Sequence, residues 1–305
     1  MHAVNYGEVI LIKGRVLKIL SDRFVVDNGS EAVFAKARKK LKECNLLAGD
    51  IAELEFVSGE YVLAGIQPRI RRLIRPAIAN PDQIVITVAE IPEVEFYTLD
   101  KMVINAHKVG VRTLICINKT DLATASFLDG IKKQYEGVVD KIVEVSALNS
   151  DISPLLSELK GKFSLFAGQS AVGKTSLINV VCGLSRQVGE LSEKTMRGKN
   201  TTTGVELIKI DPQTYVADTP GFATLDLDEI EGEELALYYD EYVRLADGCK
   251  YRMCTHTIEP NCAVRNAVED GRLSSERYER YKNMLEELKI NKTRRKSWRK
   301  TYESK

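Results

Sequence analysis

The sequence predicts an α/β protein built around a parallel β-sheet, with a small β-barrel before the sheet and a helical, cysteine-rich segment after it. Five short β-like runs fill residues 7–66, and strand-like runs alternate with helix-favouring stretches from about residue 82 to 228. Beyond residue 228 the chain becomes charged and helical around three clustered cysteines. Alternating strands and helices are typical of a parallel sheet covered by helices.

Composition sets broad limits on function. The 305 residues suffice for two or three domains, and 44% apolar and 29% charged residues are ordinary for globular proteins. A net charge of +1 gives no whole-molecule attraction to polyanions, so any nucleic-acid contact must come from local patches. No apolar run reaches spanning length and the N-terminus lacks a signal-peptide pattern. We therefore expect a cytoplasmic protein without a membrane partner.

The N-terminal runs cover residues 7–20, 23–28, 31–37, 50–57 and 60–66. Five short strands in about sixty residues suit an OB-type barrel, so we predict an RNA-binding barrel domain over 1–72. OB-type barrels commonly bind oligonucleotides, and Lys36 to Lys42 add a basic patch. The segment 68–81, with four arginines between two prolines, is predicted to be a linker, either a solvated connector or an RNA contact.

A phosphate-binding loop follows the apolar run FSLFA. Gly168-x-x-x-x-Gly173-Lys174-Thr175 satisfies the P-loop pattern, in which backbone N–H groups surround the phosphates. Lys174 is expected to reach the β and γ oxygens, and the Thr175 hydroxyl to bind Mg²⁺. The predicted nucleotide contacts in this loop are Gly168, Gln169, Ser170, Ala171, Val172, Gly173, Lys174, Thr175 and Ser176.

Two further segments match the γ-phosphate side of a nucleotide site. Asp218 begins the sequence DTPG, in which the carboxylate holds Mg²⁺ through water and the N–H of Gly221 meets the γ-phosphate. Between this motif and the P-loop lies RGKNTTTG, residues 197–204. Among its three threonines, Thr202 is our candidate ligand of Mg²⁺ and the γ-phosphate in a switch segment.

A base-recognition motif, Asn118-Lys119-Thr120-Asp121, follows the strand-like run RTLICI. Asp121 can accept hydrogen bonds from N1–H and the exocyclic amine of guanine, whereas adenine offers neither donor. Asn118 would tie the loop to the nucleotide and the Lys119 stem would lie against the base. Ser146 and Ala147, after the run KIVEV, suit a loop whose backbone N–H meets guanine O6.

These motifs are those of a GTPase in rotated order, because the base-binding motifs precede the P-loop and the switches. A parallel sheet tolerates such a circular permutation when every ligand-binding loop stays at the same sheet edge. We predict a circularly permuted GTPase domain over 73–228 that binds GTP or GDP with Mg²⁺.

The C-terminal cysteines form the pattern Cys249-x-x-x-x-Cys254-x-His256-x-x-x-x-x-Cys262. Three thiolates and one imidazole make a closed tetrahedral set for one structural Zn²⁺. We predict a helical zinc-binding domain over 229–305 with a basic tail, 293–300, whose Trp298 could stack on a base.

Taken with NTTTGVEL and DTPGF, these motifs resemble the circularly permuted, small-subunit-dependent GTPases of the RsgA/YjeQ type over nearly the whole chain. The resemblance implies a bacterial protein that hydrolyses GTP on the small ribosomal subunit, contacts 16S rRNA and acts late in subunit assembly. A monomer is the default expectation.

The sequence departs from that family at two positions. Ala171 stands where the family usually has glycine, which we expect to have little effect if the backbone φ is negative. Asn200 stands where most members carry a histidine regarded as catalytic, and Phe222 cannot orient water as the corresponding glutamine of Ras does. We therefore expect slow intrinsic hydrolysis stimulated by the subunit, with Lys174, Thr202, Asn200 and Gly221 as the catalytic candidates.

Two alternatives stay open at this stage. A ribosome-binding module could hold GTP as a static or very slowly hydrolysed ligand. A metabolic P-loop kinase or ATPase is disfavoured by the guanine motif.

Overall fold

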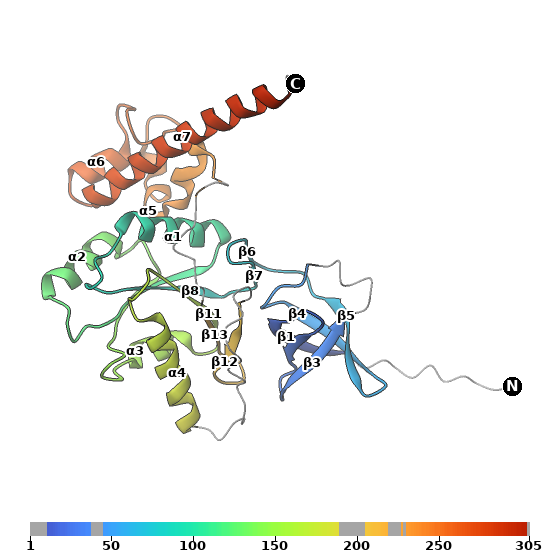
Figure 1. Cartoon of the computed structure of the whole chain (residues 1–305). Helices are drawn as coiled ribbons and strands as arrows, with labels where there is room; N and C mark the ends of the chain where they lie inside the picture. Colours follow the sequence, from blue (N-terminus) through green and yellow to red (C-terminus); the bar gives the residue numbers. More distant parts are fainter. Residues whose placement is uncertain (1–10, 38–44, 189–204, 219–226, 228–229, 304–305) are drawn as a thin grey trace. The chain divides into compact units, whose positions relative to one another are not determined.

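The computed structural model describes residues 11–37, 45–188, 205–218, 227 and 230–303, without the side chains of 184–188 and 294–303. The chain divides into two compact units. The first comprises Met1–Gln83, Leu156–Phe166 and Thr175–Thr219, and the second comprises Ile84–Leu155, Ala167–Lys174 and Pro220–Lys305. Figure 1 shows the elements of both units.

The first unit contains the predicted N-terminal barrel. Its alternating residues point inward, and Val16, Leu54 and Leu63 are fully buried in its core. The closed order is β1-β2-β3-β5-β4, in which β3 and β5 pair in parallel and the other neighbouring strands pair antiparallel. The five strands are β1 Ile12–Ile19, β2 Phe24–Asp27, β3 Ala32–Ala37, β4 Ile51–Val57 and β5 Glu60–Ile66.

The segment predicted to be a linker is folded onto the barrel instead. It forms two short paired strands, β6 Arg72–Leu73 and β7 Ile78–Ala79, whose apolar residues are buried. Arg69 makes two hydrogen bonds of 2.7 and 2.8 Å to the buried Asp50 carboxylate. Burial of Leu73, Ile78 and Ala79 packs this part of the segment, whereas the sequence predicted a linker that is either solvated or in contact with RNA.

A six-stranded sheet follows, in the order β10-β9-β8-β11-β13-β12. Every residue of β8 and β11 is buried, as expected of strands covered on both faces. The sheet is mixed rather than wholly parallel, because β12 runs antiparallel to β13 after the tight turn at Asp211–Thr214. Its strands are β8 Gln83–Val88, β9 Arg112–Ile117, β10 Lys141–Glu144, β11 Phe163–Ala167, β12 Leu207–Lys209 and β13 Tyr215–Asp218.

Helices connect these strands as the alternation predicted: α1 Phe96–Val109, α2 Ala125–Tyr135, α3 Ser153–Leu159 and α4 Lys174–Val188. Local chemistry sets their ends. Thr124 caps α2 by accepting a hydrogen bond from the N–H of Phe127, and Gly110 ends α1 in the left-handed conformation.

The C-terminal part of the second unit is helical, as predicted, and α5, α6 and α7 lie together in Figure 1. Four tyrosines, 239, 242, 278 and 281, form the centre of its core. The predicted basic tail continues α7 rather than forming a separate segment. Its elements are η3 Gly232–Tyr238, α5 Asp240–Val243, η4 Ala246–Gly248, α6 Ala263–Glu269 and α7 Ser275–Glu303. Among the described residues, no helix is long and apolar enough to cross a bilayer.

Candidate nucleotide-binding site and metal centre

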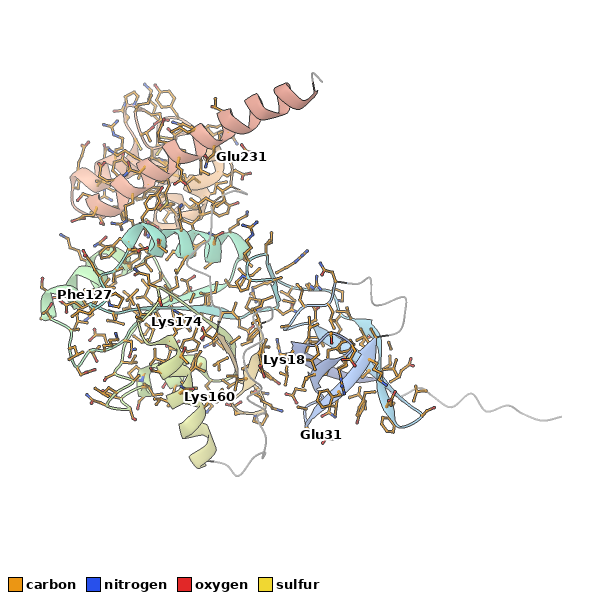
Figure 2. All side chains as sticks on the ribbon, in the orientation of Figure 1. Lys18, Glu31, Phe127, Lys160, Lys174 and Glu231 are labelled. Carbon is orange, nitrogen blue, oxygen red and sulfur yellow. The ribbon has the colours of Figure 1, made fainter. Side chains whose placement is uncertain are left out.

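The P-loop lies between β11 and α4, as the sequence predicted. Its two outer glycines are required by close approach: an added Cβ would lie 2.2 Å from the Thr87 carbonyl oxygen at Gly168 and 2.3 Å from Asn118 Nδ2 at Gly173. Both also have positive φ angles, +133° and +94°, which favour glycine. Lys174 is labelled in Figure 2. Its Nζ donates to the carbonyls of Gly168 and Gln169 at 2.8 and 2.6 Å, so its ammonium is held across the loop.

Ala171 corrects one expectation. We expected alanine in place of glycine to have little effect if the backbone φ were negative. The φ of Ala171 is +64°, in the left-handed region, so that condition is not met. The conformation directs the Ala171 carbonyl to Lys119 Nζ, which donates to it at 2.9 Å. Alanine therefore occupies a backbone conformation that costs an L-residue roughly 1–2 kcal/mol.

Ala171→Gly is expected to relieve this strain. Glycine loses more entropy on folding, so the net stabilisation should be no more than about 1 kcal/mol. The exposed Ala171 methyl group gives up little burial when removed. Thermal unfolding of the nucleotide-free variant measures the effect, and a destabilisation above about 1 kcal/mol would contradict the assignment of strain.

The predicted base motif directly contacts the P-loop. Asn118 is buried, its Nδ2 donates to the Val172 carbonyl at 2.9 Å and its Oδ1 accepts from the Ala147 N–H at 3.1 Å. One side chain thus joins three motifs that are separated in sequence by 29 and 54 residues.

Asp121 and Ser146 are also brought together. Ser146 Oγ donates to Asp121 Oδ1 at 2.5 Å, while the Asp121 side chain stays exposed at the end of the loop. A carboxylate has about four acceptor positions, so this bond leaves capacity for two donors of a base. The Ser146 hydroxyl thus orients the Asp121 carboxylate.

Nothing in the sequence indicated a set of hydrogen bonds between the P-loop and the loop that follows β8. The Gln169 side chain accepts from the Glu95 N–H at 3.0 Å and donates to the Glu93 carbonyl at 3.3 Å. Lys119 Nζ also donates to the Ile91 carbonyl. The loop between β8 and α1 therefore supports both motifs, although the P-loop pattern leaves the identity of Gln169 unspecified.

Thr175 and Asp218 form the pair expected at a magnesium ion. Thr175 Oγ1 donates to Asp218 Oδ2 at 3.3 Å. Asp218 Oδ1 is buried and has no hydrogen-bond partner in the described part of the chain. An unpartnered carboxylate oxygen beside a hydroxyl suits Mg²⁺, which prefers hard oxygen ligands and retains water.

Other candidates are placed differently. Ser170 and Ser176 are exposed on the loop and the first turn of α4. Asn200, Thr202 and Gly221 lie outside the described residues, together with Phe222.

The cysteine cluster comes together as predicted. The ligand atoms of Cys249, Cys254, His256 and Cys262 lie within 4.8 Å of one another. Cys249 Sγ is 3.9 Å from Cys262 Sγ, and His256 Nδ1 is 3.4 Å from Cys262 Sγ. Two sulfurs each about 2.3 Å from a tetrahedral Zn²⁺ lie about 3.8 Å apart, so the donor set fits this ion.

The surrounding residues fix the ligands. Tyr278 donates its hydroxyl to the His256 carbonyl and Tyr281 to the Thr255 carbonyl, both at 2.7 Å. The Glu259 carboxylate accepts from the N–H and hydroxyl of Thr255 and from the N–H of Thr257. Burial opposes ionisation of Glu259, but these hydrogen bonds outweigh it and lower its pKa to about 2.

Protein surroundings alone disfavour thiolates here. Burial raises the pKa of Cys254 to about 12 and also raises that of Cys262. A bound divalent cation would reverse this preference, because it stabilises each thiolate directly. The four side chains therefore form a group that could hold a metal ion.

A P-loop, a guanine motif ahead of it in the chain and a following Asp218 strand define a circularly permuted GTPase. The family model described as RsgA GTPase matches residues 66–228, and one described as 50S ribosome-binding GTPase matches residues 164–293. The chain belongs to the RsgA GTPase family, which confirms the family, permuted fold and GTPase activity predicted from the motifs.

Relatives and solved structures agree over almost the full length. A protein of Caldanaerobacter subterraneus subsp. tengcongensis, named small ribosomal subunit biogenesis GTPase RsgA, is 38% identical and matches over 93% of this chain and 98% of its own. YjeQ from Thermotoga maritima has a TM-score of 0.79 at 33% identity, covering 92% and 99% of the two chains. YloQ, described as a circularly permuted GTPase, has a TM-score of 0.77 at 28% identity, covering 95% and 99%.

Proposed function

We propose that this GTPase binds the small ribosomal subunit through its 16S rRNA and acts in the late assembly of that subunit, in the cytoplasm. The relatives that match over most of the chain carry the name small ribosomal subunit biogenesis GTPase. We further propose that it acts as a monomer, with a low intrinsic rate that the subunit raises.

The bridge made by Asn118 carries the nucleotide part of the proposal. It joins the P-loop to the Ser146–Ala147 loop, so guanine would lie beside Asp121 while its phosphates lie in the P-loop. In this assignment Asp121 reads the base, the Ala147 N–H meets O6, and Lys119 covers the base with its aliphatic stem. Lys174 and the loop N–H groups bind the phosphates.

Thr175 and Asp218 would hold Mg²⁺, which neutralises charge on the phosphates when bound. The buried, unpartnered oxygen of Asp218 supports this assignment. Thr175 follows Lys174 directly in the chain, so the cation would be near the β and γ phosphates. Thr202 would add a ligand from the switch segment.

Hydrolysis needs a group that orients the attacking water. We assign this position to Asn200, which can donate and accept hydrogen bonds but cannot take up a proton at neutral pH. The Gly221 N–H would contact the γ-phosphate. A slow intrinsic rate follows, because no general base stands at the position where the family usually has histidine.

Multiple-turnover phosphate release, with and without small subunits, tests the proposal. We expect stimulation by at least about tenfold, corresponding to about 1.4 kcal/mol of transition-state stabilisation. Asn200→His should raise the intrinsic rate while GTP affinity stays unchanged. Absence of turnover in both conditions would favour the alternative of a static GTP ligand. Asn200 and Phe222 motivate this alternative, because Asn200 cannot take up a proton at neutral pH and Phe222 cannot orient water.

The cysteine cluster is proposed to bind one structural Zn²⁺. Cys262→Ser should abolish zinc binding and unfold the loop around it, because structural zinc contributes on the order of 10 kcal/mol to folding of small domains. Metal analysis and circular dichroism measure both effects.

Cys182→Ser is the matched control, since it makes the same chemical change outside the cluster. It should retain about one zinc per chain. Full zinc content in Cys262→Ser would contradict the ligand assignment.

The barrel and the C-terminal helix are proposed to contact rRNA. On the barrel, Phe56 and Phe34 are 60% and 47% exposed, and Phe56 pairs with Tyr61 at a 5.0 Å ring separation. Exposed aromatic rings offer stacking surfaces for unpaired bases. The basic runs 36–42 and 293–300 would neutralise phosphates, which makes binding dependent on salt concentration.

A further inference from the structure

The first two barrel strands hold the β12–β13 hairpin. Asp27, at the end of β2, is only 3% exposed although it is a carboxylate. Its Oδ2 accepts from the Tyr215 hydroxyl at 2.6 Å, and its Oδ1 accepts from Lys209 Nζ at 2.9 Å. Tyr215 and Lys209 are cross-strand partners in the hairpin, so one barrel residue holds both strands.

Arg15 makes a second contact with Tyr215, through the ring. It is the cross-strand partner of Asp27, and its guanidinium lies 5.1 Å from the centre of the Tyr215 ring. The ring is therefore contacted by a cation while its hydroxyl is bound by a carboxylate. The same guanidinium lies 5.4 Å from the Phe163 ring at the start of β11.

The hydrogen bonds at Asp27 keep its buried carboxylate ionised. Burial opposes ionisation of Asp27, but hydrogen bonds from Lys209, Tyr215 and the Gly29 N–H lower its pKa. Burial raises the pKa of Tyr215, and its hydrogen bond to Asp27 raises it further. The ionised carboxylate and the neutral phenol are thus the stable pair.

A second contact lies just before the start of β12. Lys18 of β1 forms a 2.6 Å ion pair with Glu206, and Figure 2 labels Lys18 on the barrel. Glu206 immediately precedes β12 and lies two residues after Gly204, the end of the threonine-rich segment. Strand β1 therefore contacts the hairpin both at Tyr215 and beside the switch segment.

The hairpin connects these contacts to the chemistry. β13 runs from Tyr215 to Asp218, whose carboxylate accepts the hydrogen bond from Thr175. β12 begins three residues after Gly204, the end of the segment that contains Thr202. We propose that Asp27, with Arg15 and Lys18, positions this hairpin, so that occupancy of the barrel by rRNA sets the rate of GTP hydrolysis. The inference rests on the proposed function and names the barrel as the element that receives the stimulus.

Coupling of this kind is reciprocal, so bound nucleotide must also affect the barrel. Hydrogen exchange of residues 12–27 tests this in the full chain without ribosomes, by comparison of GDP with a non-hydrolysable GTP analogue. We expect exchange rates to differ by about fivefold between the nucleotides. Asp27→Asn and Tyr215→Phe should remove the difference, and circular dichroism checks that both variants are folded.

Asp22→Asn is the matched control. It removes the same charge from the same barrel at a side chain that is 64% exposed and pairs with Arg23 on the surface. The nucleotide-dependent difference should persist there. An equal difference in all variants, or none in the wild-type chain, would overturn the inference.

Phosphate release then separates positioning from structural support. Asp27→Asn and Tyr215→Phe should lower the subunit-stimulated rate about tenfold while the intrinsic rate and GTP affinity stay within about twofold of wild type. Equal losses in both rates would overturn the positioning role. Wild-type protein that shows the exchange difference but no stimulation by subunits would contradict the proposed function and leave the barrel–hairpin coupling supported.

Discussion

Asp121→Asn is expected to exchange the preference for guanine for a preference for xanthine. Guanine presents two donors, N1–H and the exocyclic amine, to the carboxylate. An asparagine amide accepts only one of them and directs its own N–H at the other. One charged hydrogen bond is lost, and the asparagine N–H and the exocyclic amine face each other as two unpaired donors. Together these changes should weaken GDP binding by about 10³-fold or more.

Xanthine restores the match, because a carbonyl replaces the exocyclic amine and can accept from the asparagine N–H. The Ser146 hydroxyl, which donates to Asp121 Oδ1 at 2.5 Å, can donate equally to the amide oxygen. Competition of labelled GDP and xanthosine diphosphate, measured by equilibrium binding, shows both changes.

Asp129→Asn provides the control for this experiment. Asp129 is exposed on α2, so the substitution makes the same change in charge without touching the base loop. It should leave guanine preference intact. GDP affinity within about tenfold of wild type in Asp121→Asn would show that another group reads the base.

The sequence predicted the placement of the P-loop and of the NKTD motif, because each motif is a short run with its own local chemistry. Gly168 and Gly173 are needed by close backbone approach, and NKTD lies at the end of a buried strand. The permuted order could also be read directly from the chain, since it concerns only the succession of motifs.

Interactions between distant single residues could not be read in the same way. Nothing in the sequence around Gln169 indicates that its side chain reaches Glu93 and Glu95, 76 and 74 residues away. The left-handed backbone at Ala171 also escaped prediction, because alanine gives no signal of positive φ. The segment 68–81 was predicted to be a linker because of its four arginines, and nothing in its sequence indicated that Leu73, Ile78 and Ala79 are buried.

A buried ionic network in the second unit is the largest feature that the sequence did not reveal. Asp100 of α1 and Arg277 of α7 are 0% and 2% exposed, and Arg277 donates to Asp100 Oδ1 and to Glu241 Oε1. Asp100 also accepts from Arg280 and from the Tyr135 hydroxyl. The ion pairs of this network fix α7 to α1, although Asp100 and Arg277 are 177 residues apart in the chain.

Arg277→Met should destabilise the protein by about 3–5 kcal/mol, because Glu241 would remain buried without its cation. Asp100 would keep Arg280 and Tyr135, so Glu241 bears most of the loss. A cavity of about 150 Å³ lined by Glu241 and Arg277 can admit water to the abandoned carboxylate, which places the cost toward the lower end. A fall of about 10 °C in the unfolding temperature is expected.

Removing the anion as well distinguishes a buried charge from lost packing. Arg277→Met combined with Glu241→Leu should recover about 2 kcal/mol of the loss, since apolar replacement of a buried pair is often nearly neutral. Arg272→Ala serves as the control, because Arg272 lines the same cavity but is 57% exposed in its ion pair with Asp270. It should cost less than about 1 kcal/mol. If Arg277→Met cost no more than Arg272→Ala, or if the double variant were less stable than the single one, the network would not be what holds α7 against α1.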